Sequence, residues 1–136
     1  MVQINSIYKG NLRFEATHGP SGTTLITDAP VDNHGKGESF SPTDLVATAL
    51  GTCILTTMAI VAKLKNIDMG EAKINVKKEM AASPPRRISA MPMIIEIPTV
   101  LTEEQKQILI KAAEGCPVKQ SLHPDVKIEI EYRWAS

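Results

Sequence analysis

The feature that most constrains the fold is a run of eighteen residues without a charged side chain, from Leu45 to Ala62. A helix this apolar is either buried in a protein core or crosses a membrane. The run contains Gly51 and four threonines, and the chain has no second run like it. We therefore predict a buried central helix rather than a membrane span.

A helix start precedes this run, where residues 41 to 44 read SPTD. Serine is a common N-cap, proline suits the first helical position, and an acid three residues after the cap meets the free amides. The helix should run to about Asn66. Because it is apolar nearly all round, one small sheet cannot cover it, and we expect a homodimer.

Alternating apolar and polar residues predict strands on both sides of the central helix. A proline within the second strand after the helix, Pro92, places that strand at an edge or at a bulge. No linker or repeat divides the chain, so we predict a single α+β domain over residues 1–136. The expected elements are a three-stranded antiparallel meander in 2–28, strands in 71–82 and 88–97, a helix from Thr102 to Gly115, a short helix from Pro117 and a strand in 126–134.

The charge balance disfavours two classes of partner. Lys plus Arg and Asp plus Glu both number 15, and no basic patch is visible that would bind nucleic acid or an anionic membrane. No secretory signal is visible at Met1, which predicts a cytoplasmic protein whose thiols are kept reduced.

The two cysteines are the candidate reactive groups. Cys116 precedes Pro117 at an expected N-cap, where helix amides would favour the thiolate and lower the thiol pKa; alternatively it is a small residue that ends a turn. Cys53 lies within the apolar helix, where burial would raise its pKa and make it an inert core residue. A reactive Cys53 needs a cation from elsewhere in the chain; the candidates are Arg13, Arg86 and Arg87.

Metal and cofactor motifs are absent from the sequence. The three histidines (His18, His34 and His123) do not have zinc-ligand spacing with the cysteines, and no nucleotide-binding loop occurs. We therefore expect neither a metal nor a cofactor. The spacing does not specify a Cys-His nucleophile pair of the hydrolase kind.

Two stretches, SPTDLVATALGTC at 41–53 and AAEGCPVKQSL at 112–122, resemble the OsmC/Ohr family of osmotically inducible and organic hydroperoxide resistance proteins. The resemblance covers nearly the whole chain, and SGTTLITDAP at 21–30 is similar to a less characterised OsmC-like branch. It implies an OsmC-like fold, in which antiparallel sheets wrap around a long central cysteine-bearing helix in an intertwined homodimer.

The same resemblance implies a thiol peroxidase. Cys53 would be the peroxidatic thiolate that reduces an organic hydroperoxide, and Cys116 would resolve its sulfenic acid to a disulfide. A dithiol reductant, lipoyl-linked in the Ohr branch, would restore both thiols.

The chain departs from the family pattern around the activating groups. The family glutamate lies ten residues before the first cysteine, where this chain has Thr43, and the carboxylate is shifted to Asp44. The family arginine comes from the first hairpin, and Arg13 is the nearest match. The resemblance thus makes Arg13 and Asp44 candidate activating residues.

Two other functions remain open at this stage. One is a non-catalytic dimer that binds a small apolar ligand, and the other is a redox sensor in which disulfide formation changes a partner contact.

Overall fold

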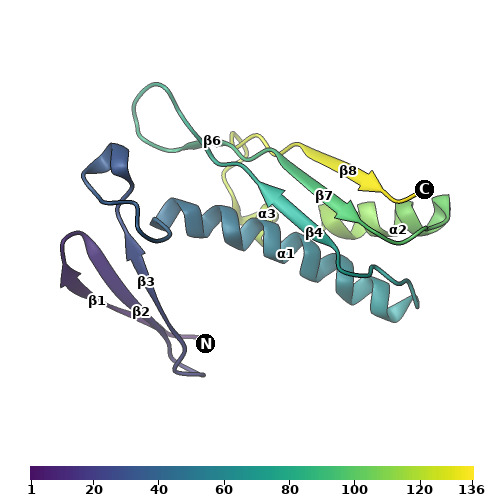
Figure 1. Ribbon diagram of the computed structural model, residues 1–136, viewed down its shortest axis with the longest axis horizontal. Helices are drawn as coiled ribbons and strands as arrows, with labels where there is room; N and C mark the ends of the chain where they lie inside the picture. Colours follow the sequence, from purple (N-terminus) through teal and green to yellow (C-terminus); the bar gives the residue numbers. More distant parts are fainter. The chain divides into compact units, whose positions relative to one another are not determined.

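The computed structural model describes residues 1–136, which form two compact units, Met1–Val46 and Ala47–Ser136. The chain combines helices with mostly antiparallel sheets and is an α+β protein, as predicted (Figure 1). The elements in chain order are β1 (Ile4–Gly10), β2 (Arg13–His18), β3 (Thr24–Asp28), the 3₁₀ helix η1 (Val31–Asn33), α1 (Pro42–Leu64), β4 (Lys73–Val76), β5 (Glu79–Met80), β6 (Ile88–Ala90), β7 (Met93–Ile97), α2 (Glu103–Glu114), α3 (Pro117–Ser121) and β8 (Ile130–Trp134).

The first unit contains the predicted three-stranded meander, β1-β2-β3, with antiparallel pairing throughout. Asn11 and Leu12 join β1 to β2 with positive φ angles of 54° and 62°, as a type I′ hairpin turn requires. Within residues 1–46 only Asp28 and Ser41 are buried, and both are polar. This unit therefore buries no apolar side chain of its own.

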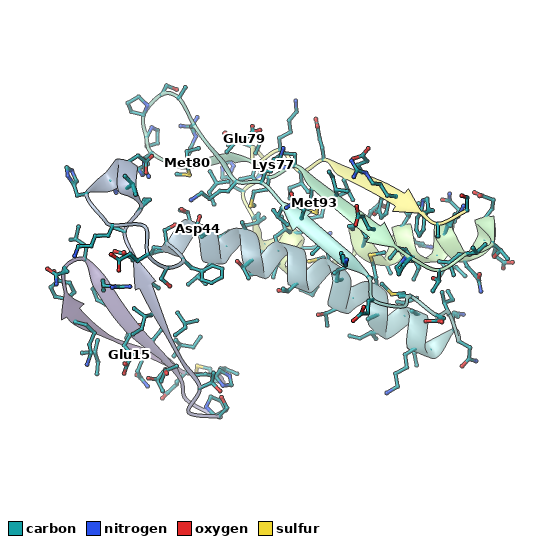
Figure 2. All side chains as sticks on the ribbon, viewed as in Figure 1. Glu15, Asp44, Lys77, Glu79, Met80 and Met93 are labelled. Atoms are coloured by element: carbon teal, nitrogen blue, oxygen red, sulfur yellow. The ribbon has the colours of Figure 1, made fainter.

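Helix α1 begins where the sequence predicts. The Ser41 hydroxyl accepts a hydrogen bond from the Asp44 amide (3.1 Å), and the Asp44 carboxylate accepts one from the Ser41 amide (2.9 Å). This reciprocal pair is a capping box, and it places Asp44 in the first turn of the helix (Figure 2). The helix ends at Leu64, and Asn66 follows in a left-handed conformation, with φ 56°.

The second unit contains a sheet in the order β4-β7-β8 and a two-stranded sheet, β5-β6. Strands β7 and β8 are parallel, which differs from the expected all-antiparallel pairing. The reason is the connection: α2 and α3 separate these two strands along the chain, and a crossover through helices returns the chain in the same direction.

The strands predicted in 71–82 and 88–97 are each broken in two. β4 pairs with β7 and β5 pairs with β6, and the break in the second segment falls at Pro92, whose carbonyl accepts from the Lys77 amide at 2.9 Å. The prediction of an edge strand was wrong, since β7 lies between β4 and β8. The alternative prediction, an irregularity at Pro92, agrees with the structure. Proline has no amide hydrogen to donate, and Pro92 lies between the paired residues of β6 and those of β7.

One face of the β4-β7-β8 sheet forms the core of the second unit. Helix α1 packs closely on it: a Cβ at Gly51 would lie 2.7 Å from a methyl of Val76. From α2, the Lys106 ammonium lies 5.8 Å from the centre of the Trp134 ring. The side chains on this face, as the register pairs them, are Ile74, Val76, Met93, Ile95, Ile97, Ile130, Tyr132 and Trp134.

By length and composition alone α1 could cross a membrane, with a mean hydropathy of 2.1 over eighteen residues. The core helix of a globular protein passes the same test. The buried residues of α1 lie along one side, and Ile60 and Leu64 on other sides are 56% and 76% exposed.

Candidate active site

Cys53 lies in the middle of α1. It is at the border between the buried side of the helix, which carries the fully buried Leu50 and Ile54, and the more exposed side. Its side chain is half-buried, and its thiol is free. It is therefore not enclosed in the core as an inert cysteine of an apolar helix would be.

Cys116 is the N-cap of α3, as the sequence predicts. Its sulfur accepts a hydrogen bond from the Lys119 amide at 3.5 Å. Pro117 has no amide hydrogen, so Val118 and Lys119 carry the free amides of the first turn. Cys116 is completely buried, and its thiol is also free.

The two thiols meet in the second unit, although they lie 63 positions apart along the chain. Their side chains share a hydrogen bond, in which Cys116 donates and Cys53 accepts. The amide of Val118 at the start of α3 also points at both sulfurs. The short helix thus presents both a second thiol and a backbone donor to Cys53.

The pKa of Cys53 lies below its ordinary value. Burial raises this pKa, but hydrogen bonds from the Cys116 side chain, the Val118 amide and the Thr57 hydroxyl together outweigh burial. Donors that favour the charged form of a group lower the pKa of an acid. A nearby cation is therefore not the sole way to stabilise this thiolate, contrary to the expectation from the sequence.

The pKa of Cys116 is raised, which contradicts the predicted lowering. Burial is the main cause, and the hydrogen bond to Cys53 adds to it. The amides of Lys119 and Val118 do lower the pKa, as expected at a helix start, but they do not outweigh burial. The pair is therefore polarised, with Cys53 as the better thiolate and Cys116 as the thiol that donates to it.

Thr57 and Val118 also contact the Cys53 sulfur, and neither residue was predicted from the sequence. The Thr57 hydroxyl donates to the Cys53 carbonyl at 2.9 Å and lies near the sulfur as well. Its position four residues after Cys53 was a usable signal, because residues i and i+4 are neighbours on a helix. Val118 gave no such signal, since its amide contribution does not depend on the side chain.

The residues predicted to activate Cys53 lie in the first unit or in the loop between β5 and β6. Arg13 and Asp44 belong to the first unit, where Arg13 forms an ion pair with Glu38 (3.4 Å) and Asp44 closes the capping box. Arg87 donates to carbonyl oxygens of its own loop, at Ser83 and Pro85 (3.0 and 2.8 Å). Arg86 is exposed in the same loop.

The structure contains no group of three or more His, Cys, Asp or Glu side chains that could hold a metal ion. His18 contacts the hydroxyl of Ser21 at 2.6 Å, and His123 lies 3.7 Å from Asp125, both on exposed segments.

The family model for OsmC-like proteins matches residues 35–131. The chain belongs to the OsmC-like family. The comparison with curated proteins returned no match.

Solved structures of OsmC-like proteins extend the likeness to nearly the whole chain. A protein from Psychrobacter arcticus 273-4, described provisionally as an osmotic stress induced and detoxification response protein, is 42% identical, with a TM-score of 0.91 over 97% of this chain and 96% of that one. An OsmC-like protein from Mycoplasma pneumoniae is 17% identical, with a TM-score of 0.84 over 100% and 98%. An organic hydroperoxide resistance protein from Elizabethkingia anophelis is 16% identical, with a TM-score of 0.78 over 98% and 95%. The last two support the fold alone.

Proposed function

We propose that this OsmC-like protein is a thiol-dependent peroxidase that reduces organic hydroperoxides in oxidative-stress defence. The observation that carries the proposal is the polarised thiol pair, in which Cys53 has a lowered pKa and Cys116, with a raised pKa, donates a hydrogen bond to it. A thiolate is the reactive form of cysteine, and a second thiol within reach can resolve its oxidised product. Relatives of the same fold include organic hydroperoxide resistance proteins.

In the first step, the Cys53 thiolate attacks the terminal oxygen of a hydroperoxide. A sulfur–oxygen bond forms while the oxygen–oxygen bond breaks, so two electrons pass from sulfur to the peroxide. The alkoxide that leaves takes up, through solvent, the proton that Cys53 released on ionising. The products are Cys53 sulfenic acid and an alcohol.

In the second step, the Cys116 sulfur attacks the sulfenic sulfur of Cys53. A disulfide forms, the sulfur–oxygen bond breaks, and the hydroxide combines with the Cys116 proton to leave as water. An external dithiol, lipoyl-linked or of similar chemistry, then reduces the disulfide by exchange and is itself oxidised to a disulfide. This cycle requires neither metal nor cofactor, and it suits a cytoplasmic setting.

Arg13, from the same or a partner chain, is proposed to support the charge on Cys53. An arginine stays ionised at any physiological pH and favours a nearby anion. Asp44 is retained as a further candidate for orienting that arginine, beside its place in the capping box. The proposed substrate class is an organic hydroperoxide, because residues 45–62 around Cys53 carry no charged side chain and would favour contact with an apolar group.

The test is a titration of the reduced protein with an organic hydroperoxide, followed by a count of free thiols by mass spectrometry. We expect one equivalent of hydroperoxide to remove both thiols rapidly. If both thiols persist, the peroxidase proposal fails and a non-catalytic ligand-binding protein is favoured. Slow oxidation coupled to a change in a partner contact would instead favour a redox sensor.

We also propose a homodimer in which residues 1–136 of each copy act as one domain. One face of the meander carries Ile4, Tyr8, Phe14 and Leu25, which are 66%, 55%, 44% and 44% exposed. Three strands without a covered apolar face are not stable alone, and a second copy supplies the cover that the family fold implies. Light scattering after size exclusion should give twice the chain mass of 14.8 kDa; a monomer at micromolar concentration would contradict this.

A further inference from the structure

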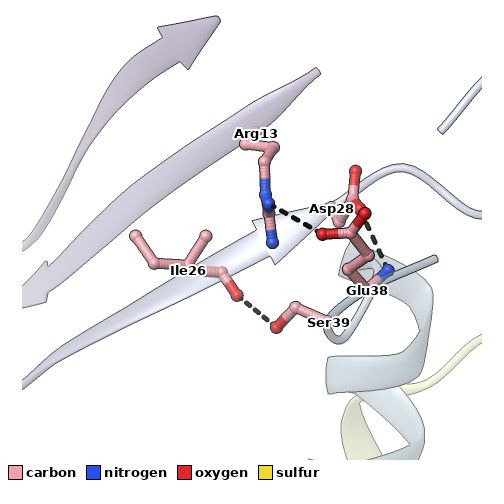
Figure 3. A network of polar contacts seen from close by, with 5 residues as sticks. All are labelled: Arg13, Ile26, Asp28, Glu38 and Ser39. Atoms are coloured by element: carbon pink, nitrogen blue, oxygen red, sulfur yellow. Dashed lines mark hydrogen bonds and ion pairs between the residues drawn. The ribbon is translucent and has the colours of Figure 1, made fainter. Parts of the chain in front are cut away.

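Two acidic residues lie near Arg13 within the first unit. It is the first residue of β2, and its paired position on β3 is Asp28. Residues directly opposite each other in an antiparallel pair project from the same face, with Cβ atoms about 5 Å apart. On another side, the Arg13 guanidinium donates to the carboxylate of Glu38 at 3.4 Å (Figure 3).

Asp28 is the buried member of this cluster, at 1% exposure. One carboxylate oxygen accepts from the Glu38 amide at 3.1 Å, and the other has no hydrogen-bond partner. The Arg13 Nε is likewise buried without a partner. Burying a carboxylate is costly unless a positive charge compensates it, and the residue at the paired position is Arg13. Asp28 thus favours a guanidinium at this place.

The segment that carries Glu38 is hydrogen-bonded to β3. In addition to the hydrogen bond from the Glu38 amide to the Asp28 carboxylate, the Asp28 amide donates to the Phe40 carbonyl at 3.1 Å. The Ser39 hydroxyl donates to the Ile26 carbonyl at 2.7 Å (Figure 3). These contacts hold the Glu38 carboxylate beside Arg13. The ion pair is partly exposed and contributes little to stability, so its effect is on the orientation of Arg13.

We propose that Glu38, anchored by the buried Asp28, is the positioning carboxylate for Arg13. This rests on the proposed function, in which Arg13 supports the Cys53 thiolate. The chain has Thr43 at the position of the family glutamate, and Asp44 closes the capping box. The carboxylate that contacts Arg13 comes instead from the loop after η1, five residues before Thr43 (43 − 38 = 5).

The experiment is a double-mutant cycle on the full chain, with the rate of Cys53 oxidation by an organic hydroperoxide as readout. Glu38→Gln and Arg13→Ala should each slow oxidation about tenfold, and the double variant should be no slower than Arg13→Ala. Glu38→Asp should recover most of the lost rate. Glu15→Gln, the same change two residues along β2 on the face of Arg13, serves as the control and should stay within about twofold of wild type.

The outcomes separate the two proposals. A wild-type protein that consumes no hydroperoxide overturns both the peroxidase and the role of Glu38. An active wild type with an unchanged rate in Arg13→Ala overturns the roles of both Arg13 and Glu38 and leaves the peroxidase proposal standing. An active wild type with an unchanged rate in Glu38→Gln overturns only the role of Glu38. So does a double variant whose losses add, since additive effects mean that the two residues act independently.

Discussion

Replacing Cys53 with serine is expected to abolish reaction with organic hydroperoxides, lowering the oxidation rate by at least about 10³-fold, or about 4 kcal/mol of barrier. The reason is that the remaining thiol cannot take its place. Cys116 is fully buried, and its pKa is raised, so little of it is thiolate at neutral pH. The measurement is the loss of hydroperoxide and of free thiols under single-turnover conditions.

Circular dichroism of Cys53→Ser provides the control for folding, because the half-buried Cys53 contributes little packing that serine would lose. If Cys116 were oxidised in this variant as fast as Cys53 is in the wild type, the assignment of the two roles would be reversed. That result would also contradict the opposite pKa shifts of the two thiols.

Cap chemistry made the helices predictable from the sequence. Ser41, Thr102 and Cys116 each cap a helix in the structure, and Thr102 forms a full capping box with Gln105. These signals are local, since every partner lies within three residues. Two short motifs around the cysteines likewise indicated that the chain is an OsmC-like protein.

Contacts between distant segments could not be predicted in the same way. The parallel pairing of β7 with β8 depends on how α2 and α3 lead the chain back. The lowered pKa of Cys53 depends on donors from α3, which come from the far end of the chain. The apolar helix by itself predicts an inert cysteine, because it contains only Thr57 to oppose the effect of burial and none of the donors from α3.

The site around Arg13 illustrates the same limit on a smaller scale. The sequence identified Arg13 as a candidate, but its ion-pair partner Glu38 lies in a loop without periodicity. Only the pairing of β2 with β3 brings Asp28 opposite Arg13 and so fixes where the loop returns.

Replacing Cys116 is expected to stop the catalytic cycle after the first step. Both Cys116→Ser and Cys116→Ala should lose at least about 100-fold in turnover with a dithiol reductant, about 2.7 kcal/mol of barrier. The sulfenic acid of Cys53 has no resolving thiol in either variant and should be trapped by dimedone, as seen by mass spectrometry. Disulfide formation in either variant at the wild-type rate would contradict the resolving role.

The same two variants separate the resolving role of Cys116 from its hydrogen bond to Cys53. A serine hydroxyl can still donate to the Cys53 sulfur, whereas alanine cannot. In the wild type the alkylation rate of Cys53 should reach half its maximum at a lower pH than that of an ordinary thiol, since the lowered pKa of Cys53 means that the thiolate persists to lower pH. Cys116→Ala should move this midpoint to higher pH, because a donor to the thiolate is lost, while Cys116→Ser should keep it near or below the wild-type position. If the midpoint were the same in the wild type and in Cys116→Ala, the thiol–thiol hydrogen bond would have no part in charging Cys53, and the Val118 amide and Thr57 hydroxyl would remain as the donors that lower its pKa.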